Sequence, residues 1–106
     1  MFEVVKKNTR PNTNVEFFNI KHIPGISAEA AKYFPEKYIK TGKCISITKT
    51  LSDDNLIEFT VEKWDSRDSY LEYMCDSFFD DHIKQFAIEH AIKYGIKFEM
   101  ISAKEL

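Results

Sequence analysis

The sequence predicts an α+β domain in which two helical regions pack on one face of a four-stranded antiparallel sheet. Four segments have the composition or the period-two alternation of strands, at residues 2–9, 44–51, 56–64 and 96–100. Two longer segments between them carry apolar residues at helical spacing, at residues 12–43 and 65–94. A chain of 106 residues is long enough for one hydrophobic core and too short for two. We therefore expect a single domain over 1–106.

The first strand is expected at residues 2–9, where two consecutive valines favour a pleated backbone and an Arg-Pro-Asn sequence follows. The helical region after it is interrupted by proline and glycine. Its first part is a short helix over 15–19 that Thr13 or Asn14 can cap, and its second part is a helix capped by Ser27. Pro35 is expected to kink or restart this second helix, because proline lacks an N–H and clashes with the preceding turn.

Residues 44–51 and 56–64 are the clearest strand pair, and the turn Ser-Asp-Asp-Asn joins them. The second of these strands alternates between an apolar and a polar set: Ile57, Phe59 and Val61 against Glu58, Thr60 and Glu62. Such alternation is typical of a sheet with one covered and one free face. We therefore expect the helices to cover the apolar set and to leave the polar set free for pairing or for a pocket.

The second helical region is expected to begin at Asp65 or Ser66, since either residue can cap it. An interruption follows near 76–77, where Ser77 begins a sequence that resembles a new helix start. Gly95 then ends the long helix. One stripe of this helix is expected to face the sheet, namely Phe79, Ile83 and Phe86. The last strand alternates apolar and charged residues from Ile96 to Met100.

The resulting order is strand, helix, strand, strand, helix, strand. Two helical regions and a sheet with one apolar face bury each other's apolar surface as two packed layers. With a right-handed crossover in each half, this order is the ferredoxin-like βαββαβ topology. The expected fold is therefore a ferredoxin-like two-layer sandwich.

The stretch Glu62–Tyr70, which reads Glu-Lys-Trp-Asp-Ser-Arg-Asp-Ser-Tyr, resembles a pattern of the dimeric α+β barrel superfamily. In that superfamily a strand ends in Glu-x-Trp, and a capped helix with an aromatic residue follows. Members include antibiotic-biosynthesis monooxygenases, haem-degrading monooxygenases and stress-responsive barrel proteins. The resemblance implies a homodimer whose two sheets curl into one barrel with the helices outside. It also places Tyr73 where many of the monooxygenases carry a histidine.

Composition and charge argue against several classes of partner. The net charge is −2 and the lysines are mixed with acidic residues, so we expect no nucleic-acid partner. No apolar run approaches the roughly 18 residues of a membrane span, and the N-terminal residues lack the apolar core of a signal peptide. We therefore expect a cytoplasmic protein with no membrane partner. Cys44 and Cys75 could form one disulfide, but two buried free thiols fit the sequence better.

The residues that we expect to carry any chemistry are Trp64, Glu62, Tyr73 and His82. Trp64 has the same phase as the polar set of its strand, so its ring is placed to line a pocket. The structural alternative is that Trp64 packs at a dimer interface or against the start of the next helix. The tyrosines likewise have an alternative role at the edge of the core, with buried rings and hydroxyls in water.

Three carboxylates are expected on the polar face: Glu58, Glu62 and Glu99. In a closed cavity two of them could serve as acid and base, if burial raised the pKa of one. The alternative is that they face water or pair with Lys6 and Lys97. His22, His82 and His90 lack the i,i+4 spacing that binds zinc on a helix, so we expect no metal site and no cofactor.

Two functions of different classes fit these features, and a plain monomer is a third possibility. We favour a non-enzymatic homodimer that binds a small apolar ligand or serves as an assembly module. The alternative is a cofactor-independent enzyme, monooxygenase-like or isomerase-like, that acts on a small aromatic substrate in the barrel cavity. A cavity lined by the candidate residues favours the enzyme, whereas a solidly packed interior argues against it.

Overall fold

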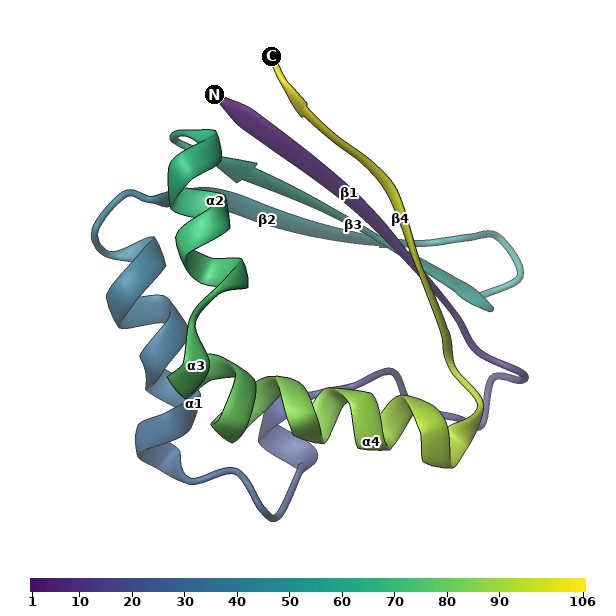
Figure 1. Ribbon diagram of the computed structural model, residues 1–106. Helices are drawn as coiled ribbons and strands as arrows, with labels where there is room; N and C mark the ends of the chain where they lie inside the picture. The colour runs from purple at the N-terminus through teal and green to yellow at the C-terminus, as the bar shows by residue number, and fades with distance from the viewer.

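The computed structural model describes all residues, 1–106, and contains one four-stranded sheet in the order β2-β3-β1-β4 (Figure 1). All neighbouring strands are antiparallel. The strands are β1 Phe2–Thr9, β2 Cys44–Leu51, β3 Ile57–Trp64 and β4 Lys97–Glu105. This order and pairing are those of the ferredoxin-like fold, so the predicted fold class is confirmed.

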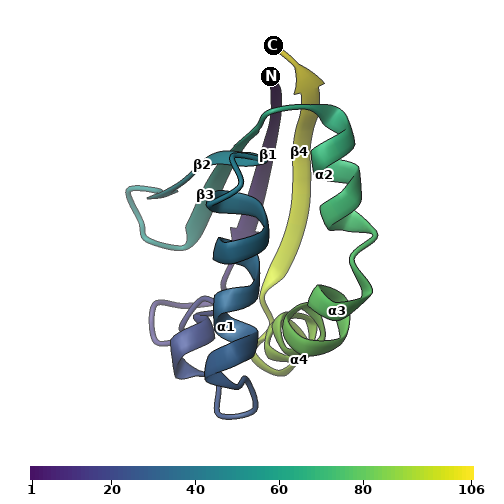
Figure 2. The same ribbon diagram turned by 90° about the vertical axis from the view of Figure 1, so that its left-hand side faces the viewer.

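The helices lie on one side of the sheet (Figure 1). The first helical region contains η1 Ile20–His22, α1 Ala28–Phe34 and the π-helical turn η2 Pro35–Ile39. The second contains α2 Arg67–Met74, α3 Ser77–Phe79, the π-helical turn η3 Asp80–Lys84 and α4 Gln85–Tyr94. Figure 2 views α4 nearly along its axis, so this helix crosses the direction of α1. None of the helices combines the length and the apolar character that crossing a membrane requires.

Short polar side chains begin the helices, largely where the sequence predicts. Ser27 accepts a hydrogen bond from the amide of Ala30 at 3.1 Å, and Ser66 accepts one from Ser69 at 3.1 Å. The restart after α2 is capped one residue earlier than expected, because Asp76 rather than Ser77 accepts from the amide of Phe79 at 3.1 Å. Gly95 ends α4 with a left-handed φ of 72°, which glycine adopts without steric cost.

The short helix predicted over 15–19 is wrong. This part of the chain has no helix until η1, which Asn19 caps through a hydrogen bond from the amide of Lys21 at 3.1 Å. Side chains occupy the backbone groups that a helix would need: Asn12 accepts from the amide of Asn14 at 2.9 Å, and Arg10 donates to the carbonyl of Val15 at 2.9 Å. Such side-chain bonds compete with helix formation.

The helices cover the polar face of β3, which is the opposite of the prediction. Trp64 packs on rings of α2, and the residues of its phase are buried: Thr60, Glu62 and Trp64. Side chains alternate across a strand, so Ile57, Phe59 and Val61 point away from the helices. The prediction that these three residues pack beneath Phe79, Ile83 and Phe86 is therefore wrong. We call the face with Glu58, Thr60, Glu62 and Trp64 the helix-side face, and the face with Ile57, Phe59 and Val61 the open face.

Strand β1 supplies much of the apolar surface on the helix-side face. Phe2 lies opposite Trp64, and Val4 lies opposite Glu62. These residues form the buried core together with side chains of β2, η2 and α2: Phe2, Val4, Tyr38, Cys44, Trp64 and Tyr70. Burial of such large apolar groups contributes on the order of 1.5–3 kcal/mol each, which favours this face as the covered one.

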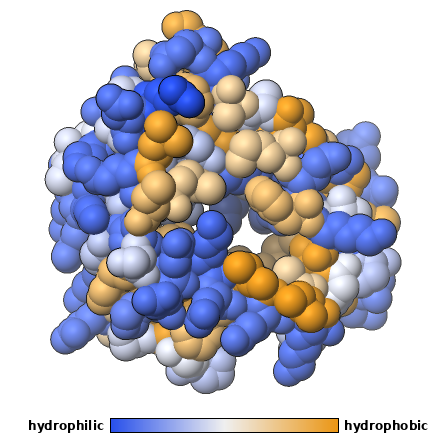
Figure 3. All heavy atoms as spheres, viewed as in Figure 1, coloured by the Kyte–Doolittle hydropathy of each residue, from blue (hydrophilic) through white to orange (hydrophobic).

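The core fills only one end of the helix-side face, and α4 stands away from the other end. Ile88 and Ile92 of α4 are 50% and 77% exposed, and Phe98 and Met100 of β4 are 59% and 41% exposed. Figure 3 shows an opening through the molecule between the sheet and α4, with apolar side chains on its rim. The molecule is therefore hollow where the helix-side face is not packed.

Candidate functional site

Glu62 and Lys6 form an ion pair on the helix-side face. Lys6 Nζ lies 2.8 Å from Glu62 Oε2, and the indole Nε1 of Trp64 donates to Glu62 Oε1 at 3.1 Å. The side chains of Lys6 and Glu62 are 15% and 8% exposed. Both carboxylate oxygens have a partner, as a buried charge requires. The pairing with Lys6 that was expected as the structural alternative for Glu62 is thus confirmed.

Trp64 is part of a packed aromatic cluster. Its ring stacks on Tyr73 at a centroid distance of 5.2 Å, and it meets Tyr70 and Tyr38 edge-on at 5.6 and 5.7 Å. Phe34 closes the cluster at 6.1 Å. Trp64 is 0% exposed, so its ring belongs to the core and has no surface on which a ligand could bind. The packing of Trp64 against the next helix, named above as an alternative, is present.

The rings of Tyr70 and Tyr73 lie beside Lys6 of the ion pair. Lys6 Nζ lies over both rings, 5.9 Å from the centroid of Tyr70 and 5.7 Å from that of Tyr73. Burial and the charge of Glu62 raise the pKa of both phenols, so both are protonated at neutral pH. The hydroxyl of Tyr70 is buried without a hydrogen-bond partner. It is therefore an unsatisfied hydrogen-bond donor inside the core.

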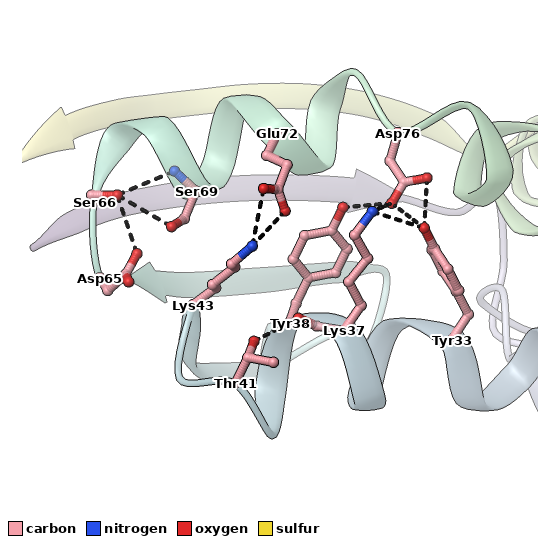
Figure 4. Close-up of polar contacts among 10 residues, drawn as sticks. All are labelled: Tyr33, Lys37, Tyr38, Thr41, Lys43, Asp65, Ser66, Ser69, Glu72 and Asp76. Atoms are coloured by element: carbon pink, nitrogen blue, oxygen red, sulfur yellow. Dashed lines mark hydrogen bonds and ion pairs between the residues drawn. The ribbon is translucent and has the colours of Figure 1, made fainter.

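Asp76 joins the two helical regions through a buried carboxylate (Figure 4). Its oxygens accept from the hydroxyl of Tyr38 at 2.5 Å and from that of Tyr33 at 2.8 and 3.0 Å, and Lys37 Nζ lies 3.1 Å away. Burial of the carboxylate raises its pKa, but the bonds from Tyr38, the Phe79 amide, Tyr33 and Lys37 outweigh that effect. Together they lower the pKa of Asp76 to about 2. This network fixes η2 against the start of α3.

A cleft of about 550 Å³ lies between the β2–β3 hairpin and the segment Glu16–Ile20. We call it the hairpin cleft and the segment the wall segment. The hairpin contributes residues of the helix-side face, since Leu51 lies opposite Glu58 in the register. Residues from both sides line the cleft: Phe17, Phe18 and Ile20 from the wall segment, and Lys49, Leu51 and Glu58 from the hairpin. The cleft therefore combines apolar walls with charged groups.

Arg10 fastens the wall segment to the hairpin. Its Nε donates to the carbonyl of Asn55 in the hairpin turn at 2.8 Å, and its Nη1 donates to the carbonyl of Val15 at 2.9 Å. The guanidinium also lies 4.6 Å from the ring centroid of Phe17. One side chain thus connects both sides of the hairpin cleft.

The structure brings three of the four predicted site residues together. Trp64, Glu62 and Tyr73 lie in one group around Lys6. His82 lies apart from them on η3, where its ring stacks on Phe78 at 4.1 Å and its Nδ1 lies 2.9 Å from the carbonyl of Phe78. The group around Lys6 is buried or half-buried, whereas His82 is exposed.

Two other expectations need correction. Glu99 lies opposite Lys7, and Lys7 lies opposite Phe59, so Glu99 belongs to the open face and cannot act with Glu62. Glu58 is on the helix-side face as expected and lines the hairpin cleft. Both cysteines are free thiols; Cys44 is buried as expected, but Cys75 is exposed.

Two residues of the site were not among the candidates: Arg10 and Asp76. Lys6 was expected as a pairing partner of the polar-face carboxylates, and Tyr70 was one of the tyrosines considered. Period-two alternation in β1 places Lys6 in phase with Phe2 and Val4. Asp76 directly precedes Ser-Phe-Phe, a sequence in which the aspartate is itself a good cap. Nothing local marks Arg10, because its partners in the hairpin turn are distant along the chain.

No protein-family model and no curated protein sequence matches the chain. Several solved structures resemble it along nearly its whole length. One is a protein from Deinococcus radiodurans, provisionally named an antibiotic biosynthesis monooxygenase, with a TM-score of 0.56 and 12% identity over 100% of this chain and 92% of that one.

Two further structures are similar. A conserved protein of unknown function from Bacteroides thetaiotaomicron, with oxidoreductase as its suggested class, has a TM-score of 0.60 and 16% identity over 99% of this chain and 96% of that one. A dimeric ferredoxin-like protein from an uncultured marine organism has a TM-score of 0.61 and 9% identity over 99% and 94%. These are the protein classes to which the sequence resemblance pointed. At such identities the similarity concerns the fold, and the chain has the ferredoxin-like fold that these proteins share.

Proposed function

We propose that this protein is a homodimeric binding module that holds a small, largely apolar ligand in the hairpin cleft. The observation that carries the proposal is the cleft itself: about 550 Å³ between the helix-side face and the wall segment, with aromatic walls and charged groups at its margin. Sites for small organic molecules usually have volumes of about 300–1,000 Å³ and combine apolar walls with a few polar groups.

The lining indicates the class of ligand. Phe17, Phe18, Ile20 and Leu51 offer apolar surface on both sides of the space, which suits a flat ring system or a short aliphatic chain. Lys49 and Glu58 offer one donor and one acceptor group from the hairpin. A small aromatic molecule with one or two hydroxyl groups would satisfy both kinds of surface.

Binding without catalysis is favoured by the state of the residues that were expected to react. Glu62 already accepts hydrogen bonds at both oxygens, from Lys6 and Trp64. Trp64 itself is fully buried. A carboxylate that is paired in this way is a poor base, since removing a proton from a substrate would require it to leave a buried ammonium group.

A second candidate function is an oxygenase-like enzyme, and the hydroxyl of Tyr70 is the observation that favours it. This hydroxyl is buried, protonated and without a partner, and it is placed beside Glu62 and Lys6. A structurally similar protein bears the name of an antibiotic biosynthesis monooxygenase. Oxygen uptake with 1,8-dihydroxynaphthalene, measured above the spontaneous rate without protein, decides between the two: the enzyme would raise this rate and lose the increase in Tyr70→Phe, whereas the binding module would leave the rate unchanged.

The second copy of the chain is proposed to cover the open face. Ile57, Phe59 and Val61 form an apolar row there, and Val5 lies opposite Val61 in the register and extends the row onto β1. No helix of the same chain covers this face (Figure 1). A structural neighbour is described as a dimeric ferredoxin-like protein, which supports a homodimer here.

The direct test of ligand binding uses 2-naphthol as a probe. We expect wild-type protein to bind 2-naphthol, and Leu51→Asp to weaken binding at least tenfold because a carboxylate replaces an apolar contact in the cleft. Ile92→Asp is the matched control, since Ile92 is 77% exposed on α4 and outside the cleft. Equal loss of affinity in both variants, or no binding by the wild type, would contradict the proposed site.

A further inference from the structure

We propose that His90 is a positioning residue for the hairpin cleft: its imidazole holds the wall segment Glu16–Ile20 against α4 and thereby sets the width of the cleft. The inference rests on the ligand-binding function proposed above. It concerns a residue on the far side of the wall segment, which does not line the cleft itself.

The contact joins two parts of the chain that are far apart in sequence. His90 Nε2 lies 2.7 Å from the carbonyl oxygen of Glu16, 74 residues away. A carbonyl oxygen only accepts, so Nε2 carries the proton and donates. The imidazole ring lies between two aromatic rings, with Phe18 edge-on at 6.0 Å and Tyr94 at 4.7 Å. The ring of His90 is therefore held in one orientation.

The wall segment has little else to hold it in place. Residues 16–19 have no regular secondary structure, and the amides of Glu16, Phe17, Phe18 and Asn19 make no backbone hydrogen bond. Arg10 holds the segment from the hairpin side through Val15. His90 is the polar contact that holds it from the side of α4. A segment of this kind is positioned by side chains, so the loss of its hydrogen bond to α4 changes where it lies.

The same segment separates the hairpin cleft from a second cleft on the side of α4. This second cleft has a volume of about 660 Å³. Glu16 lines both clefts, and the other residues that line them are different. Movement of the wall segment therefore widens one space at the expense of the other. By fixing Glu16 and packing on Phe18, His90 keeps the segment in the position that gives the hairpin cleft its observed width.

His22 also contacts Glu16, but its role is different. Its Nδ1 lies 2.5 Å from Glu16 Oε1, and the two side chains are 60% and 56% exposed. The two residues are only six positions apart along the chain. Their contact is therefore local and does not determine how far the wall segment lies from α4. An exposed pair of this kind contributes little to stability.

The test compares His90→Phe, which keeps an aromatic ring and loses the donor, with His90→Gln, which keeps a donor. His82→Phe is the matched control, because His82 contacts a carbonyl of its own helical run, four residues away. We expect His90→Phe to weaken 2-naphthol binding by about three- to tenfold, which corresponds to the loss of one hydrogen bond. His90→Gln and His82→Phe should bind within about twofold of wild type. Unchanged affinity in His90→Phe would overturn the inference.

A second readout separates this inference from the function on which it rests. Without ligand, amide hydrogen exchange and amide chemical shifts at residues 16–20 should change in His90→Phe and stay as in wild type in His82→Phe. If wild-type protein binds no 2-naphthol, the proposed function fails, and these amide data still decide whether His90 holds the wall segment. Amides at 16–20 that do not respond to His90→Phe would refute the positioning role.

Discussion

Trp64 and Glu62, two positions apart on β3, are linked by a hydrogen bond of 3.1 Å from the indole nitrogen to the carboxylate. The other carboxylate oxygen binds Lys6 at 2.8 Å. Trp64, Glu62 and Lys6 thus form one largely buried unit at the packed end of the helix-side face. Their arrangement explains why the polar side of β3 can be covered by helices: its charge is paired there, and its largest side chain is apolar.

Loss of Lys6 should destabilise the fold strongly. Lys6→Met leaves the carboxylate of Glu62 buried without its counter-charge, and we expect the free energy of unfolding to fall by about 3–5 kcal/mol. The double variant Lys6→Met/Glu62→Met should recover most of this loss, because no unpaired charge remains. Urea denaturation measures both. Lys43→Met is the control, since Lys43 and Glu72 are 35% and 43% exposed. Exposed pairs of this kind contribute only about 0–1 kcal/mol to stability. Equal losses of stability in Lys6→Met and Lys43→Met would show that the Lys6–Glu62 pair is not buried.

The fluorescence of Trp64 should be shielded from water-soluble quenchers. It is the single tryptophan and is 0% exposed, so iodide should quench it several-fold less than it quenches a free tryptophan derivative. The exposed reference is a protein in which Trp64→Phe is combined with Ile92→Trp. Strong quenching of the native tryptophan would mean that its ring lines an open cavity after all.

Asp76 should make the stability of the protein depend on acid pH. Its pKa is about 2 in the folded state and 3.8 in the reference state, so the folded state prefers the charged form. The resulting stabilisation is complete above about pH 4 and is lost as the pH falls through 2. We expect wild type to lose about 2 kcal/mol relative to Asp76→Asn between pH 5 and pH 2. Urea denaturation of both proteins across this range gives the difference, and parallel curves would contradict the role of Asp76.

Charge on the open face should prevent association of two chains. Phe59→Lys places an ammonium group in the middle of the apolar row, and sedimentation equilibrium should then report a monomer while the circular dichroism spectrum stays native. Ile92→Lys, on exposed α4, should leave the dimer intact. A wild-type protein that sediments as a monomer would contradict the proposed interface.

The sequence predicted the strands well because each is marked by local patterns. The bounds of β1 and β2 were predicted correctly, and β3 begins one residue later than predicted. The last strand extends further than predicted, because residues 102–105 pair with β1 beyond a bulge at Ile101, although they do not alternate. The caps Ser27 and Ser66 were also recognisable, since one side chain and one nearby amide define each of them.

Which face of β3 is covered was not predictable from its alternation. Ile57, Phe59 and Val61 look like the buried set, yet Phe2 and Val4 of β1 join Trp64 on the other face. That choice depends on the register between strands more than 50 residues apart, and no local pattern encodes it. The role of Arg10 could not be predicted for the same reason, because its partner Asn55 lies in the hairpin turn 45 residues away.

Nuclear Overhauser effects in the labelled protein locate bound 2-naphthol and so test the proposed binding site most directly. We expect contacts from the naphthol protons to the methyl groups of Leu51 and the ring of Phe18, which line the hairpin cleft from the hairpin and from the wall segment. Contacts to Ile57, Phe59 and Val61 on the open face, with none to Leu51 or Phe18, would contradict the proposed site.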